Sequence, residues 1–222
     1  MSDIEKIKVP TMAEMMAAGE TPEILFWVGC SGSFDDRAKK ITKAIVKILH
    51  NAKVKFAVLG AEESCTGDPA KRAGNEFNFQ MQAMMNIQVL DGYEVKKIVT
   101  GCPHCFNTLK NEYPELGGNY EVIHHTQLIQ DLIKSEKLTL KGGGGFKGKK
   151  ITFHDPCYLG RANDVYEAPR ATMEKLDAEL IEMKRCKQNG LCCGAGGAQM
   201  FIEAKKGDKE INVERTGDAI DT

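Results

Sequence analysis

The sequence of 222 residues lacks the features that would hold a protein in a membrane or on a nucleic acid. It has no run of 18 apolar residues, so we expect no membrane-spanning segment. The 30 Lys and Arg residues are balanced by 31 Asp and Glu, and aromatic residues make up only 7%. Nucleic-acid-binding proteins concentrate positive charge, so we expect no nucleic acid partner.

Two further motifs are missing. The first ten residues, MSDIEKIKVP, lack the basic and apolar regions of a secretory signal, which favours the reducing cytoplasm. No GxGxxG motif follows an expected strand, so the chain has no evident dinucleotide site of its own for hydride chemistry.

Cysteine, in contrast, is plentiful. In a reducing compartment, spaced cysteines indicate metal or redox chemistry more often than disulfide bridges. The eight cysteines are Cys30, Cys65, Cys102, Cys105, Cys157, Cys186, Cys192 and Cys193.

The cysteine spacing repeats along the chain. A shift of 127 residues places Cys30 on Cys157 and Cys65 on Cys192, with 34 residues inside each pair. The same shift places Ile24 on Ile151 and Phe26 on Phe153, so apolar residues and cysteines keep one register. The sequence therefore predicts two copies of one structural unit.

Apolar runs that end near cysteines predict the fold. Residues 24–28 lead to Cys30, residues 54–59 lead to the loop of Cys65, and residues 97–100 lead to Cys102. Strands alternating with helices predict an α/β fold, here two pseudo-symmetric repeats, each an open, mostly parallel sheet with flanking helices. We expect an N-terminal arm (1–21), a first cysteine-rich domain (22–140), a glycine-rich linker (141–149) and a second cysteine-rich domain (150–222).

The second repeat looks incomplete. The shifted positions of Cys102 and Cys105 would be 229 and 232, past Thr222. We expect either that this repeat has no CxxC pair or that the chain stops about ten residues before it, the latter being favoured.

Helix signals fill the intervals between the strands. Thr11 and Glu14 form a capping-box pattern before Met12, Met15 and Met16. Asp68 and Pro69 resemble an N-cap followed by proline at the first helical position. The expected buried faces comprise Phe34, Ala38, Ile41, Ile45 and Ile48 in one helix, Phe77, Met81 and Met84 in the next, and Met173 and Leu176 in a later helix begun by Pro169.

The cysteine loops are rich in glycine, most clearly in LCCGAGGAQM, residues 191–200. Glycine lets backbone N–H groups approach a bulky anionic cofactor closely. The glycines expected to form the cofactor cradle are Gly67, Gly101, Gly194, Gly196 and Gly197.

Two metal cofactors suit the first cysteine set. Cys30, Cys65, Cys102 and Cys105 supply the four thiolates of an ordinary [4Fe-4S] cluster, and the same number satisfies a structural zinc ion. Cys157, Cys192 and Cys193 form the second set, which provides three thiolates.

The motifs Cys30, Cys65-Thr66-Gly67, Cys102-Pro103-His104-Cys105 and Cys157, Cys192-Cys193-Gly194 resemble the tandem cysteine-rich, or CCG, domains of the heterodisulfide reductase catalytic subunit. Similar modules occur in iron-sulfur subunits of glycolate oxidase, anaerobic glycerol-3-phosphate dehydrogenase and lactate-utilisation proteins. The resemblance implies a [4Fe-4S]-type cluster at each full motif, and electron transfer to a disulfide or quinone-linked acceptor. Thr66 stands where the family has a second cysteine, which favours a cubane over a noncubane cluster.

Further side chains near the cysteines have candidate roles. Cys157, Cys192 and Cys193, with His154 as a proton relay, are the candidate catalytic residues for thiol chemistry, although a histidine after a strand is often structural. His104 is expected to shape the cluster environment. Cys186 is expected to be a buried thiol, and His124 and His125 have no assigned role.

Two functions follow from this pattern. The first is an electron-transfer subunit of an oxidoreductase, working with a ferredoxin-type or flavoprotein partner, and either free in the cytoplasm or held at the inner membrane face by a membrane-bound, quinone-linked partner. The second is a zinc-stabilised structural or interaction module without redox turnover.

Overall fold

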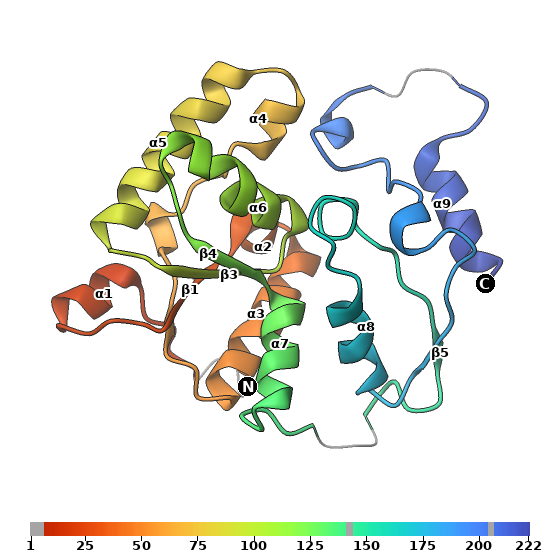
Figure 1. Cartoon of the computed structure of the whole chain (residues 1–222), viewed down its shortest axis with the longest axis horizontal. Helices are drawn as coiled ribbons and strands as arrows, with labels where there is room; N and C mark the ends of the chain where they lie inside the picture. Colours follow the sequence, from red (N-terminus) through yellow and green to blue (C-terminus); the bar gives the residue numbers. More distant parts are fainter. Residues whose placement is uncertain (1–6, 141–143, 204–206) are drawn as a thin grey trace.

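The computed structural model describes residues 7–140, 144–203 and 207–222. Part of the expected linker, 141–143, and of the expected N-terminal arm, 1–6, therefore lies outside the described residues. Residues 7–140, here the first half, and residues 144–203 with 207–222, here the second half, lie side by side (Figure 1).

The first half is built on a parallel sheet in the order β2-β1-β3-β4. The strands are β1 (Ile24–Trp27), β2 (Phe56–Ala57), β3 (Lys97–Thr100) and β4 (Glu121–His124). The helices are α1 (Met12–Ala17), α2 (Gly29–Phe34), α3 (Asp36–Asn51), α4 (Asp68–Arg72), α5 (Glu76–Gly92), α6 (Pro103–Asn107) and α7 (His125–Lys134). Shorter turns cover Gly60–Glu62, Thr108–Glu112 and Tyr113–Leu116.

The second half contains a two-stranded parallel sheet of β5 (Lys150–Ile151) and β6 (Glu179–Leu180). Its helices are α8 (Glu167–Glu174) and α9 (Ile211–Ile220), with 3-10 turns at Lys187–Asn189 and Gln199–Phe201. Each of these strands is two residues long. The helix of Pro169 begins two residues earlier than expected, at Glu167.

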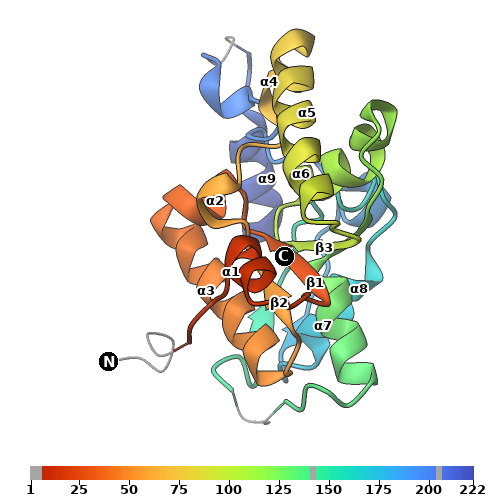
Figure 2. The same cartoon turned by 90° about the vertical axis from the view of Figure 1, so that its left-hand side faces the viewer.

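Side chains of β1 alternate between two apolar layers, as the period of a strand requires. Leu25 and Trp27 pack with α1, α5 and α6, whereas Ile24 and Phe26 pack with α3 and α7. Figure 2 shows α3 and α5 on either side of this sheet. Helices on both faces of a parallel sheet confirm the expected α/β class.

The predicted buried face of α5 is wrong. Phe77, Met81 and Met84 are 76%, 49% and 60% exposed, and the buried residues are Phe79, Ala83, Asn86, Ile87 and Leu90. This helix carries apolar side chains on all sides, so periodicity alone does not select the face that meets the core.

Three smaller predictions also differ from the structure. Phe34 is exposed and ends the separate helix α2, so it does not belong to the helix of Ile45 as predicted. Ile41 is exposed because α3 meets the sheet through Ile45, Val46 and Leu49. Met16 is exposed, while Met12 and Met15 are buried behind a capping box at Thr11.

The N-cap of α4 is also one residue earlier than predicted. It is Gly67 in a left-handed conformation, and Asp68 is the first helical residue.

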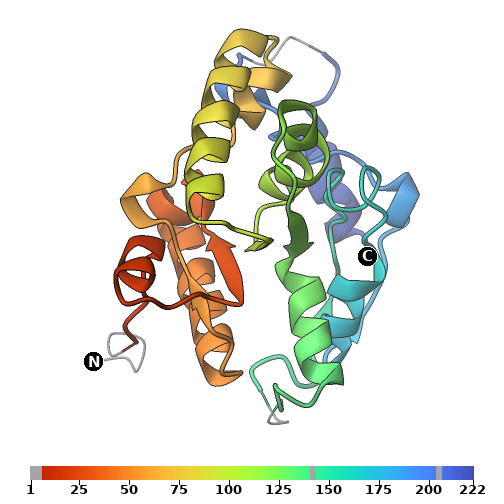
Figure 3. The same ribbon diagram turned by 60° about the vertical axis from the view of Figure 1, so that its left-hand side comes forward.

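The two halves pack through α7 against α8 (Figure 3) and through side chains near the cysteine loops. Asn163 bonds to Asn107 and Asn111, and Leu159 joins the core beneath β1. In the part of the chain that the structure describes, no helix is long and apolar enough to cross a membrane.

Candidate functional site

The first cysteine set lies where strands β1, β2 and β3 end. Cys30 follows β1 and Cys102 follows β3, while Cys65 lies in the loop after β2. In the order β2-β1-β3-β4, the chain passes from β1 to β2 on one side and from β3 to β4 on the other side. The connections that follow the neighbouring strands β1 and β3 therefore lead away from each other. Such a switch point opens a crevice at the carboxyl ends of the strands, which is where parallel sheets bind their ligands.

The four thiols of this set lie as two interacting pairs, Cys30 with Cys65 and Cys102 with Cys105. The partner thiol lowers the pKa of Cys30 and of Cys102 to about 6 each. The pairs adjoin each other, since a Cβ on Gly29 would lie 3.5 Å from Cys105 Sγ. All four sulfurs that the sequence singled out therefore gather at one edge.

Backbone N–H groups surround these sulfurs. The amides of His104 and Cys105, at the start of α6, lower the pKa of the Cys102 thiol, and the amide of Ser31 lowers the pKa of Cys30. Backbone N–H groups near sulfur stabilise thiolates and tune the reduction potential of a thiolate-bound cofactor. The donor set has the chemistry that an iron-sulfur cluster requires.

A single metal ion has a different requirement. Zinc binds four ligands around one point, with sulfur at about 2.3 Å. Among residues 7–140, 144–203 and 207–222, no three His, Cys, Asp or Glu side chains are grouped in this way.

Thr66 lies at the position where the second CCG motif has Cys193. The Thr66 side chain is buried, and its hydroxyl donates to Cys105 Sγ at 3.9 Å. The first set thus has four thiols and a neutral hydroxyl where a fifth thiol would stand.

Glu63 is a site residue that the sequence analysis missed. Its carboxylate accepts hydrogen bonds from Gly29 N at 2.5 Å and Val28 N at 3.0 Å, directly before Cys30. Burial raises the pKa of Glu63 to about 7, although both backbone bonds oppose this shift. Glu63 lies two residues before Cys65 in the sequence, and this proximity was the signal that could have identified it as a site residue.

Asn86 and Tyr113 hold the loop of Cys65 from beneath. Asn86 Nδ2 donates to the carbonyl of Cys65 at 2.9 Å, and Tyr113 Oη donates to the carbonyl of Thr66 at 3.2 Å. Neither residue adjoins a cysteine in sequence, so no motif identified them.

His104 lies between the two halves. Its Nδ1 is 2.8 Å from Asp68 Oδ2, and its ring lies 4.5 Å from that of Tyr158. Burial disfavours the charged imidazole, but the bond to Asp68 outweighs it and raises the pKa of His104. This agrees with a residue that shapes the surroundings of the cysteines.

The second cysteine set gathers at the far side of this boundary. The backbone N–H of Gly194 donates to Cys192 Sγ at 3.4 Å, and that of Ala195 donates to Cys193 Sγ at 3.5 Å. Burial and the neighbouring Cys192 raise the pKa of Cys157, so these thiols interact electrostatically.

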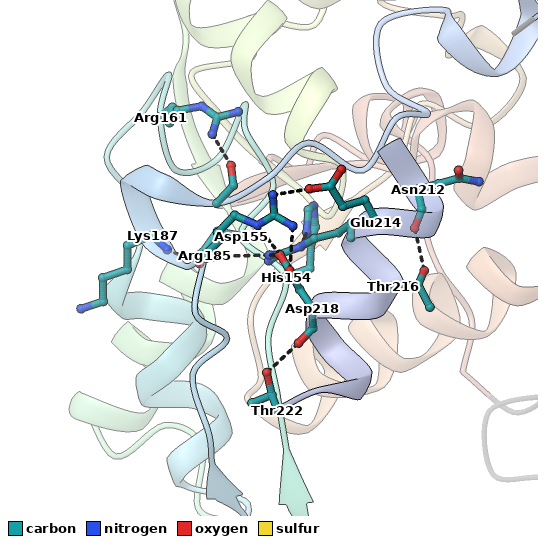
Figure 4. A network of polar contacts seen from close by, with 12 residues as sticks. His154, Asp155, Arg161, Arg185, Lys187, Asn212, Glu214, Thr216, Asp218 and Thr222 are labelled. Carbon is teal, nitrogen blue, oxygen red and sulfur yellow. Dashed lines mark hydrogen bonds and ion pairs between the residues drawn. The ribbon is translucent and has the colours of Figure 1, made fainter. Parts of the chain in front are cut away.

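His154 is fixed by α9. Its Nδ1 accepts a hydrogen bond from Arg215 Nε at 2.8 Å, within the network shown in Figure 4. Burial and the adjacent Arg215 cation lower the pKa of His154. The ring is therefore neutral, with its proton on Nε2, and a relay through Nδ1 would require this bond to break.

Asp155 anchors the turn that leads to Cys157. It accepts two bonds from Arg170, at 2.8 and 2.9 Å, and one from the backbone N–H of Lys187 at 2.7 Å. Arg161 ties the same turn to the carbonyl of Gly190 at 2.5 Å, two residues before Cys192. The loops of the second set are held together by charge.

The five glycines expected to cradle a cofactor have different neighbours. A Cβ on Gly196 would lie 2.5 Å from His104 Nε2, and one on Gly197 would lie 3.2 Å from Arg72 Cγ. These two glycines allow the halves to approach each other. The other three pack within their own half: Gly67 against Phe79, Gly101 against Ile45 and Gly194 against Asn212 at the start of α9.

The remaining predicted residues are less directly placed. Cys186 is half-buried rather than fully buried. His124 ends β4 at the same edge as Cys102, and His125 begins α7. Burial lowers the pKa values of His124 and His125 to about 3 and 4. His124 Nε2 lies 3.3 Å from the carbonyl of Gly101, so the pair supports the site edge.

Comparison with known proteins matches this arrangement to one family. The cysteine-rich domain CCG matches residues 24–110 and 151–220. The probable iron-sulfur-binding oxidoreductase FadF of Bacillus subtilis is 45% identical over 214 residues, covering 96% of this chain and 30% of that protein.

Two further relatives carry names of redox complexes. The EtfAB:quinone oxidoreductase of Syntrophomonas wolfei is 44% identical over 185 residues, covering 83% of this chain and 26% of that protein. One subunit of the dihydromethanophenazine:CoB--CoM heterodisulfide reductase of Methanosarcina barkeri is 33% identical over 209 residues, covering 90% of this chain and 49% of that protein. The chain spans at most about half the length of these relatives.

Proposed function

This chain belongs to the CCG family of cysteine-rich domains, and from that premise we propose that it is an iron-sulfur-binding, electron-transferring part of an oxidoreductase. The observation that carries the proposal is the meeting of Cys30, Cys65, Cys102 and Cys105 at the switch point of a parallel sheet. Relatives named for iron-sulfur binding and for quinone or heterodisulfide reduction support it.

The first set would hold a cubane [4Fe-4S] cluster through its four thiolates. Such a cluster supplies one-electron transfer. The chain's own residues would support it in two ways: amides at the start of α6 favour the Cys102 thiolate, and Glu63 fixes the backbone before Cys30. The buried Thr66 hydroxyl, in place of a fifth thiol, favours the cubane form.

The second set would be the reactive one. Cys157, Cys192 and Cys193 provide three thiolates, one fewer than a four-thiolate shell. Electrons would pass from a flavoprotein or ferredoxin-type partner to a disulfide or quinone-linked acceptor, and such a partner would hold the chain at the inner face of the membrane. His154 would contribute a neutral Nε2–H donor there.

Anaerobic purification followed by iron, sulfide and zinc analysis and visible absorption tests this function. Iron and sulfide with broad absorption at the blue end of the spectrum are expected. A colourless protein with zinc alone would instead make it a metal-stabilised interaction module. Cys102→Ser should remove the first cluster, and Cys186→Ser, a thiol outside both sets, is the matched control.

Substitutions in the second set separate the two sites. Cys157→Ser, Cys192→Ser and Cys193→Ser should each abolish disulfide or quinone reduction while the absorption of the first cluster remains. Unchanged turnover in all three variants would contradict the assignment of the second set as the reactive site.

A further inference from the structure

Arg215 is a buried cation with an unused hydrogen-bond donor. It projects from α9 and is 6% exposed. Its Nε donates to His154, and its Nη1 donates to the carbonyl of Arg185 at 2.7 Å and to Asp218 at 3.3 Å. Its Nη2 is buried and has no hydrogen-bond partner in the described part of the chain. An unpaired buried donor is costly and marks a missing acceptor.

The direction of this donor follows from the shape of the guanidinium group. Nε and Nη2 share one edge of the planar fork. Two neighbouring arginines show this edge filled: Arg185 holds both oxygens of Asp218 with Nε and Nη2, and Arg170 holds Glu182 in the same way. On Arg215 the edge carries His154 at Nε and, among the described residues, nothing at Nη2. The missing acceptor therefore belongs at the edge of the guanidinium that faces His154, a residue three positions before Cys157 in the sequence.

The start of α9 faces the same cysteine set. A Cβ on Gly194 would lie 3.3 Å from the backbone N of Asn212, so the first turn of α9 adjoins the CCG loop. This ten-residue helix has no side-chain cap at its N-cap Glu210. Helix N-termini carry partial positive charge and unsatisfied N–H groups. The helix that carries Arg215 therefore adjoins the CCG loop through its first turn.

The acidic groups nearby are already paired. Glu214 bonds to Arg185 at 2.5 Å. Asp218 bonds to Arg185 at 2.7 Å and, at a longer distance, to Arg215. Asp155 is held by Arg170. These three carboxylates therefore do not supply the acceptor of Arg215 Nη2.

We propose that Arg215 Nη2 donates a hydrogen bond to an anionic sulfur, a thiolate or a cluster sulfide, held by Cys157, Cys192 and Cys193. Arg215 is then a positioning residue that sets how tightly the second site retains its cluster and at what potential it is reduced. This inference rests on the proposed function. A cation beside the sulfur favours the more negative, reduced state, so its removal lowers the midpoint potential.

The test uses the full chain reconstituted anaerobically with iron and sulfide. Iron that wild type holds and Cys157→Ser does not hold belongs to the second site. In Arg215→Gln this fraction should be lost to a chelator about 10-fold faster, as for other outer-shell substitutions, and its midpoint potential should shift downward. Arg215→Lys, which keeps the charge, should lie between Arg215→Gln and wild type.

Arg185→Gln is the matched control, because it loosens α9 from the same network without removing the buried cation. It should retain iron as wild type does. Thermal unfolding of the metal-free proteins reports whether each variant folds. Should Arg215→Gln fail to fold, the rate of iron loss is compared between Arg215→Lys and wild type. Faster loss in Arg215→Lys supports the inference, and an equal rate contradicts it.

Three outcomes would overturn the inference. Folded Arg215→Gln with unchanged chelator resistance and potential would show that Nη2 donates to no sulfur. An effect confined to the apparent affinity for the acceptor would assign the donor to an anionic substrate instead. Equal iron content in wild type and Cys157→Ser would show that the second site holds no cluster for Arg215 to contact, while the cluster at the first site is unaffected. A wild type that binds no iron at all would instead refute the proposed function.

Discussion

The two halves of the chain share a cysteine pattern but not a means of support. In the first half, a four-stranded sheet is covered on both faces, and Trp27, Phe26 and Phe106 are at most 1% exposed. In the second half, the sheet is reduced to β5 and β6, and buried arginines connect the loops. Apolar packing therefore dominates beneath the first cysteine set, whereas ion pairs connect the loops of the second set.

This difference has a physical consequence. Apolar packing is non-directional and tolerates small changes, whereas a buried ion pair becomes costly as soon as one partner is removed. The second half should therefore respond sharply to the loss of single charges and weakly to the loss of single apolar groups.

The largest effect is expected at Trp27. Trp27→Ala removes a fully buried side chain beneath the cysteine edge and should lower the free energy of unfolding by about 4 kcal/mol, measured by urea denaturation. Leu180→Ala in β6, where the residue is half-buried, should cost about 1 kcal/mol or less. Equal costs would show that the second half has a core comparable to the first.

The matching change in the second half is Arg170→Met. It leaves the buried Asp155 carboxylate without its cation and should cost about 3 kcal/mol in the free energy of unfolding. Arg185→Gln breaks a partly exposed ion pair, which solvent screens, and should cost less than Arg170→Met. If Arg170→Met costs no more than Arg185→Gln, ion pairing does not support the second set.

The first half should also lose stability in acid through its buried histidines. Burial lowers the pKa of His124 to about 3, while an unfolded histidine binds a proton below about pH 6.5. Between these values the unfolded state holds more protons. Stability is thus complete above pH 6.5 and falls as pH drops, by about 1.4 kcal/mol per pH unit for this residue.

His124→Gln should reduce that slope, measured by urea denaturation between pH 7 and pH 5. Glu63 acts oppositely in this window, because its raised pKa lets the folded state keep a proton. Glu63 is present in both wild type and His124→Gln, so its contribution cancels when the two pH profiles are subtracted. Parallel pH profiles of the two proteins would mean that His124 is charged in the folded state.

The smallest effect concerns the boundary between the halves. Gly196→Ala would place a methyl group 2.5 Å from His104 Nε2 and should cost about 1–2 kcal/mol by thermal or urea unfolding. Gly92→Ala has no atom within 4 Å and should change stability by about 0.5 kcal/mol or less. Unchanged stability of Gly196→Ala would indicate that the two halves can move apart at this point without a loss of free energy.

The strands and the first cysteine set were predictable, because they depend on local pattern. Short apolar runs ending in glycine and cysteine identify β1 and β3, and residues 97–100 match the observed bounds of β3. The buried face of α5 was not predictable, because Phe77 and Phe79 are equally apolar and Phe79 is selected by packing against Gly67 and the core beneath β1.

By itself, the sequence determined which thiols belong together, since the spacing of Cys30, Cys65 and Cys102 follows from strands of fixed length and direction. Only the tertiary structure decided what surrounds those thiols. Glu63 reaches the backbone before Cys30, Gly196 meets His104, and Arg215 meets His154 across 61 residues. Periodicity encodes short-range geometry, whereas such contacts depend on how whole elements pack, and packing is set by the entire chain.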